Sequence, residues 1–186
     1  MLHDPPLAAP PKPMTRITVM QGQAIVSAGP RVELTTVLGS CVATCLFDPE
    51  IELGGMNHFL LAEPPASQKA NGFDEHYGVY LMEVLINQMR AHGASKQRLR
   101  AHLYGGANLR SGMAQIGTVN AEFAQQFLLR ERIPLIKSDL GGTQARRVDF
   151  RPAFGQVRCR LVENEMAPEP RPIQRPAAST GDVELF

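Results

Sequence analysis

The segment Leu34–Leu61, LTTVLGSCVATCLFDPEIELGGMNHFLL, decides the fold and the chemistry of this chain. It contains two of the three cysteines, Cys41 and Cys45, and a histidine, His58, seventeen residues after Cys41. Two apolar runs flank the pair Asp48-Pro49. Because Asp and Pro are favoured at the first two corners of a type I turn, we predict a β-hairpin with the cysteines on one strand and the histidine on the other.

The length of the turn sets the register of this hairpin. With Pro49 and Glu50 as the two loop residues, Cys45 faces Gly54 and Cys41 faces His58. Directly opposed Cβ atoms lie ~4.5–5.5 Å apart, within reach of a thiol–imidazole pair. Pro disfavours the tightest hairpin turns, so a longer loop with a bulge is an alternative. Another is a short helix beginning at Cys41, whose dipole would lower the pKa of the thiol.

The remaining sequence alternates between strand and helix patterns. A helix is predicted at 77–92 from its apolar stripe, and a second helix at 120–132, with Asn120 as its N-cap. Because most strands follow one another directly, we predict an α+β fold, with mostly antiparallel sheets and two or three helices. The predicted strands span residues 17–20, 24–27, 31–37, 42–47, 54–61, 99–104, 134–140, 148–150 and 157–161.

Proline-rich composition sets the expected domain limits. Residues 1–14 contain five prolines, and the chain is again rich in proline from residue 163 onward. We therefore predict one domain at 15–162 between two disordered tails, 1–14 and 163–186.

Overall composition narrows the function classes. The chain has 186 residues, of which 44% are hydrophobic and 20% charged, and a net charge of +1. No global field favours nucleic acid or an anionic membrane, so neither is predicted as a partner. No apolar run approaches the ~18 residues of a membrane-spanning helix, and the proline-broken N-terminus does not resemble a secretory signal. Three cysteines without framework spacing indicate a reducing compartment, and we expect the cytoplasm.

Cys41 is the candidate nucleophile. A thiol with a pKa of about 8.5 needs a base or a positive partner to react at neutral pH, and His58 can supply it. The competing interpretation is that both are buried structural residues, because free cysteine is among the most buried residue types.

A third residue could orient the imidazole. Thr35 could do so through its hydroxyl or its carbonyl, and by spacing alone Thr36, Ser40 and Asn57 compete with it. Ser40 and Asn57 are further candidates for supporting the oxyanion. Cys45 is interpreted as a core residue.

No metal site and no cofactor are predicted. The C-x3-C pair lacks two further zinc ligands at suitable spacing, and neither a Walker motif nor G-x-G-x-x-G is present.

Several motifs together resemble the CheD family of chemoreceptor glutamine deamidases. They are LGSCVATCLFDP, GGMNHFLL, YGGANL, IGTVNAEFAQQFLLRERIPLI and SDLGGTQARRVDFRPAFGQV, which span roughly residues 16–161. The catalytic cysteine, histidine and threonine of the family fall on Cys41, His58 and Thr35.

The resemblance implies a fold and a reaction. The fold would be an α/β/β sandwich similar to the catalytic domain of cytotoxic necrotizing factors, which are cysteine hydrolases. The reaction would convert glutamines on the cytoplasmic helices of chemoreceptors to glutamate through a cysteine thioester, and some members also bind the phosphatase CheC. The alternative is a non-catalytic module that binds receptors or a CheC-type phosphatase.

Overall fold

The computed structural model describes residues 13–61, 75–109 and 115–169. Its regular elements are β1 (Thr15–Thr18), β2 (Ala24–Ser27), β3 (Val32–Leu38), β4 (Val42–Asp48), β5 (Leu53–Asn57), α1 (Glu75–Ala91), η2 (Lys96–Arg98), β6 (Arg100–Gly105), α2 (Ile116–Arg130), β7 (Leu135–Leu140), β8 (Ala145–Arg151), η3 (Pro152–Phe154), β9 (Gln156–Val162) and η4 (Asn164–Met166).

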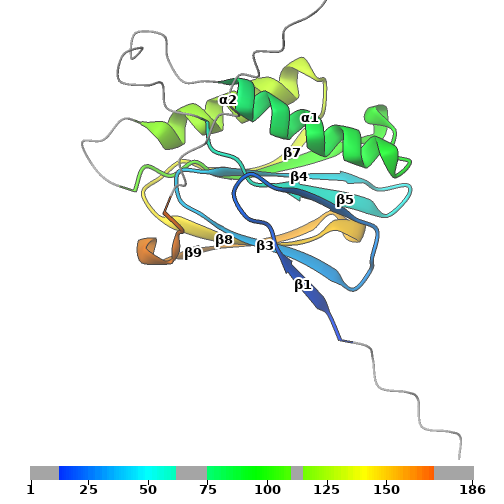
Figure 1. The fold of residues 1–186 in the computed structure, drawn as a ribbon, viewed down its shortest axis with the longest axis horizontal. Coiled ribbons are helices and arrows are strands. Elements are labelled where there is room, and N and C mark those ends of the chain that lie inside the picture. The colour runs from blue at the N-terminus through cyan, green and yellow to red at the C-terminus, as the bar shows by residue number, and fades with distance from the viewer. Residues whose placement is uncertain (1–12, 62–74, 110–114, 170–186) are drawn as a thin grey trace, which may run out of the picture.

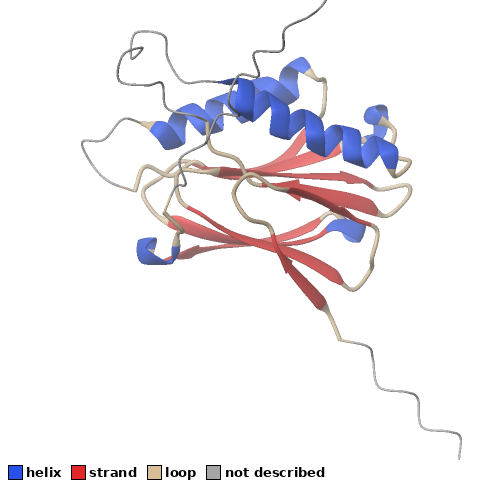
Figure 2. Ribbon diagram, viewed as in Figure 1, coloured by secondary structure: helices blue, strands red, loops and turns tan. Residues whose placement is uncertain are grey.

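The strands form two stacked sheets, and both α-helices cover the same sheet (Figure 1). The outer sheet has the strand order β1-β3-β8-β9, and the central sheet has the order β2-β5-β4-β6-β7. Figure 2 shows the layers as helices, central sheet and outer sheet. Among the described pairings, β1 with β3 and β6 with β7 are parallel and the rest are antiparallel. The prediction of a mixed α+β fold with mostly antiparallel sheets is therefore confirmed.

The central sheet is buried on both faces, which explains the nearly continuous apolar run of β4. Val42 and Leu46 contribute to the core beneath the helices, while Ala43 and Cys45 contribute to the core between the sheets. Such runs are typical of strands covered on both sides. Among the described helices, none combines the length and apolar character needed to cross a bilayer.

The predicted hairpin forms, but its register was wrong by two residues. Cys45 pairs with Met56 and Phe47 pairs with Gly54, so four residues, 49–52, separate the strands. Glu52 has a φ of 52°, a left-handed conformation that closes this longer loop. Because side chains alternate with a period of two, the shift leaves every residue on the face expected for it.

Three further expectations need correction. The alternative helix at Cys41 is not seen, because β4 begins at the next residue. The second helix begins at Ile116, so Asn120 is a buried residue within it and not its cap. The ordered domain also continues past residue 162: the amide of Asn164 accepts from the Ala145 N–H and donates to the Thr143 carbonyl. The tails 1–12 and 170–186 lie outside the described residues.

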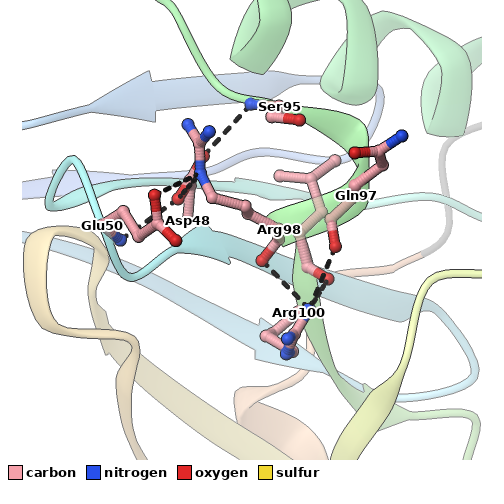
Figure 3. Close-up of polar contacts among 7 residues, drawn as sticks. Asp48, Glu50, Ser95, Gln97, Arg98 and Arg100 are labelled. Carbon is pink, nitrogen blue, oxygen red and sulfur yellow. Dashed lines mark hydrogen bonds and ion pairs between the residues drawn. The ribbon is translucent and has the colours of Figure 1, made fainter.

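The carboxylate of Asp48 lies where β4 turns toward β5, and it forms several polar contacts there (Figure 3). The Asp48 side chain is 0% exposed, and its oxygens accept from the backbone N–H groups of Glu50 and Ser95. The Arg98 guanidinium also donates to both of its oxygens at 3.0 Å. Asp48 thereby joins the β4–β5 turn to the segment between α1 and β6.

We expect Asp48→Ala to lower the free energy of unfolding by about 3 kcal/mol, because two backbone donors and a guanidinium lose their acceptor. Urea unfolding measures this loss. Glu50→Ala is the control, since Glu50 is largely exposed and its contact with Arg98 is 3.3 Å long. An equal loss in the two variants would show that the buried carboxylate has no special role.

Candidate active site

Cys41 lies where the chain crosses from β3 of the outer sheet to β4 of the central sheet. It is 5% exposed and belongs to the core between the sheets. The end of β6 holds its main chain, because the Gly106 N–H donates to the Cys41 carbonyl at 2.8 Å. Gly105 has a φ of 109°, and a Cβ there would overlap the Cys41 carbonyl oxygen. Only glycine therefore permits this close approach.

His58 follows β5 and lies on the same face of the central sheet as Cys41. The alternation of side chains along this segment supports the placement of His58. Met56 and Leu60 pack between the sheets, whereas Phe59 packs against the helices. Val42 and Phe59 exchange both backbone hydrogen bonds at 2.9 Å, so Cys41 and His58 are diagonal neighbours across the pair. Diagonal neighbours lie ~7–8 Å apart, a separation that long side chains span. The direct cross-strand opposition predicted from the shorter turn was wrong, but the shared face is confirmed.

The ring of His58 is oriented through Nδ1. This atom lies 2.9 Å from the Thr36 hydroxyl and 3.3 Å from the Val19 carbonyl. The Thr36 hydroxyl itself donates to the Val19 carbonyl at 2.9 Å. A carbonyl only accepts, so Nδ1 must carry the proton, and the lone pair of the neutral ring is on Nε2. Nε2 is buried without a hydrogen-bond partner among the described residues.

Thr35 and Thr36 face opposite sides of β3, and the structure gives them different contacts. The Thr35 hydroxyl donates to Asp149 on β8 at 2.8 Å, and it does not contact His58. The expected bond from this side chain to the imidazole is instead made by Thr36. Thr35 acts on the site through its main chain, because its carbonyl accepts from the Val19 N–H at 2.8 Å.

Burial shifts both titratable groups toward their neutral forms. It raises the pKa of the Cys41 thiol to about 12, partly offset by the backbone N–H of Cys41 itself. It lowers the pKa of His58 to about 4, partly offset by the Val19 carbonyl. The resting pair is therefore a thiol and a neutral imidazole. Such a pair suits attack in which the base takes the thiol proton as the new bond forms.

The other two candidates from the sequence contribute in different ways. The Asn57 side chain points toward the helices, where it accepts from the Thr44 N–H and donates to the Leu81 carbonyl. It therefore connects the central sheet to α1 and does not line the space beside Cys41. Ser40 contributes its carbonyl, which accepts from the Asn120 amide at 2.8 Å.

Asn120 and Gln21 are site residues that the sequence interpretation missed. The Asn120 oxygen accepts from the Leu61 N–H, so this amide links the segment before Cys41 to the segment after His58. Asn120 shares the buried side of α2 with Phe123 and Phe127. The spacing of these three residues along the helix indicates that a polar group is buried there. Gln21 comes from the β1–β2 turn, and its carboxamide oxygen lies 3.9 Å from the Cys41 sulfur.

The shifted pKa of His58 predicts how stability depends on pH. The folded value of about 4 lies below the ~6.5 of an unfolded chain, so protons favour the unfolded state. We expect the free energy of unfolding to fall between pH 6.5 and pH 4 by up to about 3 kcal/mol from this residue. Urea titrations over this range, with His58→Gln as the matched variant, measure the difference. Equal slopes in the two proteins would contradict the buried neutral ring.

The family model and the curated relatives agree on one family. A family model described as CheD chemotactic sensory transduction matches residues 60–161. A protein of Zymomonas mobilis subsp. mobilis named "Probable chemoreceptor glutamine deamidase CheD" is 55% identical over 174 residues, covering 92% of each chain. Proteins of the same name from Caulobacter vibrioides and Agrobacterium fabrum are 47% and 42% identical. They cover 99% and 92% of this chain, and 97% and 96% of their own lengths.

One of the solved structures that this chain matches is the hypothetical protein YfiH of Bacillus licheniformis. It matches with a TM-score of 0.42 and 15% identity, over 64% of this chain and 51% of its own. That similarity is too small to support a statement about function.

Proposed function

The chain belongs to the CheD family, and on that premise we propose that it is a protein-glutamine deamidase with Cys41 as nucleophile and His58 as general base. Its substrates are glutamine side chains of chemoreceptors, which the reaction converts to glutamate with release of ammonia. The change of an uncharged side chain to a carboxylate alters the receptor and thereby serves chemotaxis.

The observation that carries this proposal is the orientation of His58. Nδ1 is held by Thr36 and Val19, and Nε2 is buried without a described partner on the face that Cys41 shares. A structural histidine in a core usually has both ring nitrogens satisfied, because an unpaired buried polar atom costs about 1–3 kcal/mol. An unpaired Nε2 on the face of the sheet that also carries Cys41 suits a general base.

The reaction follows from acyl-transfer chemistry. As the Cys41 sulfur bonds to the carboxamide carbon, its proton moves to His58 Nε2 and the carbonyl π pair becomes an oxyanion. Collapse of this intermediate breaks the C–N bond, and the proton on His58 leaves with ammonia, giving a thioester. Water, deprotonated by His58, then attacks the thioester and releases glutamate and the thiol. Only side chains of this protein and water are needed.

The family resemblance extends this proposal to the fold and to the partners. We assign the layers of helices, central sheet and outer sheet to the α/β/β cysteine-hydrolase fold of cytotoxic necrotizing factors. The expected partners are the cytoplasmic helices of receptors and a CheC-type phosphatase, and the expected location is the cytoplasm. The described cysteines are free thiols, as a reducing compartment would keep them.

We expect Cys41→Ala to abolish deamidation of a receptor cytoplasmic fragment, because no thioester can form without the sulfur. The one-dalton mass increase at glutamines, measured in receptor peptides, follows the reaction, and Cys45→Ala is the control because Cys45 is buried in the core. If Cys41→Ala still modifies the receptor, the proposed chemistry is wrong. If neither wild type nor Cys41→Ala modifies the receptor but both bind it, the chain is a non-catalytic binding module.

Thr36 and Thr35 offer a matched pair of substitutions. Thr36→Val removes the hydroxyl at Nδ1 of His58, and we expect kcat to fall roughly tenfold, the equivalent of one hydrogen bond of about 1.4 kcal/mol. Thr35→Val keeps the main chain that holds Val19, so kcat should stay near the wild-type value while stability falls through loss of the bond to Asp149. The reverse pattern of kcat would assign the catalytic role to the Thr35 side chain.

A further inference from the structure

We propose that Gln21 is a catalytic residue that donates a hydrogen bond from its side-chain amide to the oxyanion formed when Cys41 attacks a substrate. This inference rests on the proposed deamidase function and adds a residue to it. The starting observation is the distance of 3.9 Å between the Cys41 sulfur and the Gln21 carboxamide oxygen. The resting thiol donates to that oxygen.

The turn that carries Gln21 is fixed by the segment that carries His58. The Gly22 N–H donates to the His58 carbonyl at 2.8 Å, and the His58 N–H donates to the Gln23 carbonyl at 3.0 Å. Inside the turn, the Gln23 side chain accepts from the Met20 N–H at 2.9 Å. Gln21 is therefore placed beside Cys41 by a short, hydrogen-bonded turn and not by a free loop.

Gly22 allows this turn to pack closely. It has a φ of 87°, and a Cβ at this position would lie 2.7 Å from the Tyr77 hydroxyl oxygen. The left-handed backbone and the close approach of α1 both require glycine at this position. The backbone next to Gln21 is thus held by its neighbours.

The chemistry of the site requires such a donor. Attack on a carboxamide places a full negative charge on an oxygen about one bond length from the carbon that bonds to sulfur. The site is buried, where an unsatisfied charge is costly, so the oxyanion needs hydrogen-bond donors beside it. One donor is the backbone N–H of Cys41, which lies close enough to its own sulfur to lower the pKa of the thiol.

Gln21 supplies the second donor, because its carboxamide lies beside the thiol. Its amide carries two N–H groups as well as an oxygen, and rotation about the last side-chain bond exchanges them. In the resting enzyme the oxygen accepts from the thiol. Once the thiol proton has moved to His58 Nε2, the N–H groups turn toward the oxyanion. The amide is thus an acceptor before attack and a donor during it.

Gln21→Met tests the role, because methionine has a similar length but no donor. We expect kcat for deamidation of a receptor cytoplasmic fragment to fall about 10²-fold, with little change in KM. Gln21→Glu, which only accepts and adds a negative charge, should lose at least as much. Gln21→His, which restores an N–H donor, should recover part of the rate. Met20→Leu is the control on the same turn, because the Met20 side chain is exposed, and it should stay within a few-fold of wild type.

Alkylation of Cys41 by iodoacetamide separates this role from an effect on the nucleophile. That reaction displaces iodide at a saturated carbon and forms no oxyanion, so its rate should be the same in wild type and Gln21→Met. Circular dichroism confirms that each variant is folded. A parallel fall of kcat and alkylation rate would mean that Gln21 acts on the thiol, and the proposal would be overturned.

Two other results would also overturn the proposal. One is an unchanged kcat in Gln21→Met. The other is a one-dalton mass increase at Gln21 in wild type but not in Cys41→Ala, which would make Gln21 a self-substrate. Inactive wild-type protein would instead refute the deamidase function itself, so the two failures are distinguishable.

Discussion

The burial of Cys41 and His58 between the two sheets is the constraint on which the rest of the site depends. Removal from water favours the neutral form of each group, so a resting thiolate–imidazolium pair is not stable there. In the proposed mechanism, charge is then created only during attack, when a substrate carbonyl can accept the electrons of the sulfur. A further consequence is chemical: a thiol that is not ionised at rest is a poor target for oxidants and alkylating agents.

The site is held together mainly by main-chain hydrogen bonds between segments that are distant in sequence. The end of β6 holds the Cys41 carbonyl, the β1–β2 turn holds both main-chain groups of His58, and β3 holds Val19. Asn120 from α2 adds a side-chain link between the segments that carry Cys41 and His58. These contacts involve both sheets and a helix, so the geometry exists only after the three layers have assembled. The stability of the fold and the geometry of this site are thus coupled through the backbone.

The sequence allowed the hairpin and the shared face of Cys41 and His58 to be predicted, because side chains along a strand alternate between its two faces. The turn could not be predicted, since Glu52 adopts a left-handed conformation that its residue type does not favour. The choice between Thr35 and Thr36 depends on which side of β3 faces the central sheet, and a strand buried on both faces does not reveal this. Resemblance to the family selected Thr35, whereas the side-chain contact belongs to Thr36.

Gln21 could not be predicted for a different reason. Its contact with Cys41 arises from the pairing of β1 with β3 and of β2 with β5, which places one turn between two sheets. No local pattern around a glutamine in a turn indicates that arrangement. Asn120 was open to prediction, because a polar residue at the spacing of an apolar helix face must find partners inside.

The central claim is that His58 rests as a neutral ring with its proton on Nδ1 and its lone pair on Nε2. Nitrogen-15 correlation spectra of the histidine rings in the full chain, with His58→Gln for assignment, report both atoms directly. We expect a protonated Nδ1 and an unprotonated Nε2 at pH 7, with the second proton binding only near pH 4. Two protonated nitrogens at pH 7, or a proton on Nε2 alone, would contradict the account.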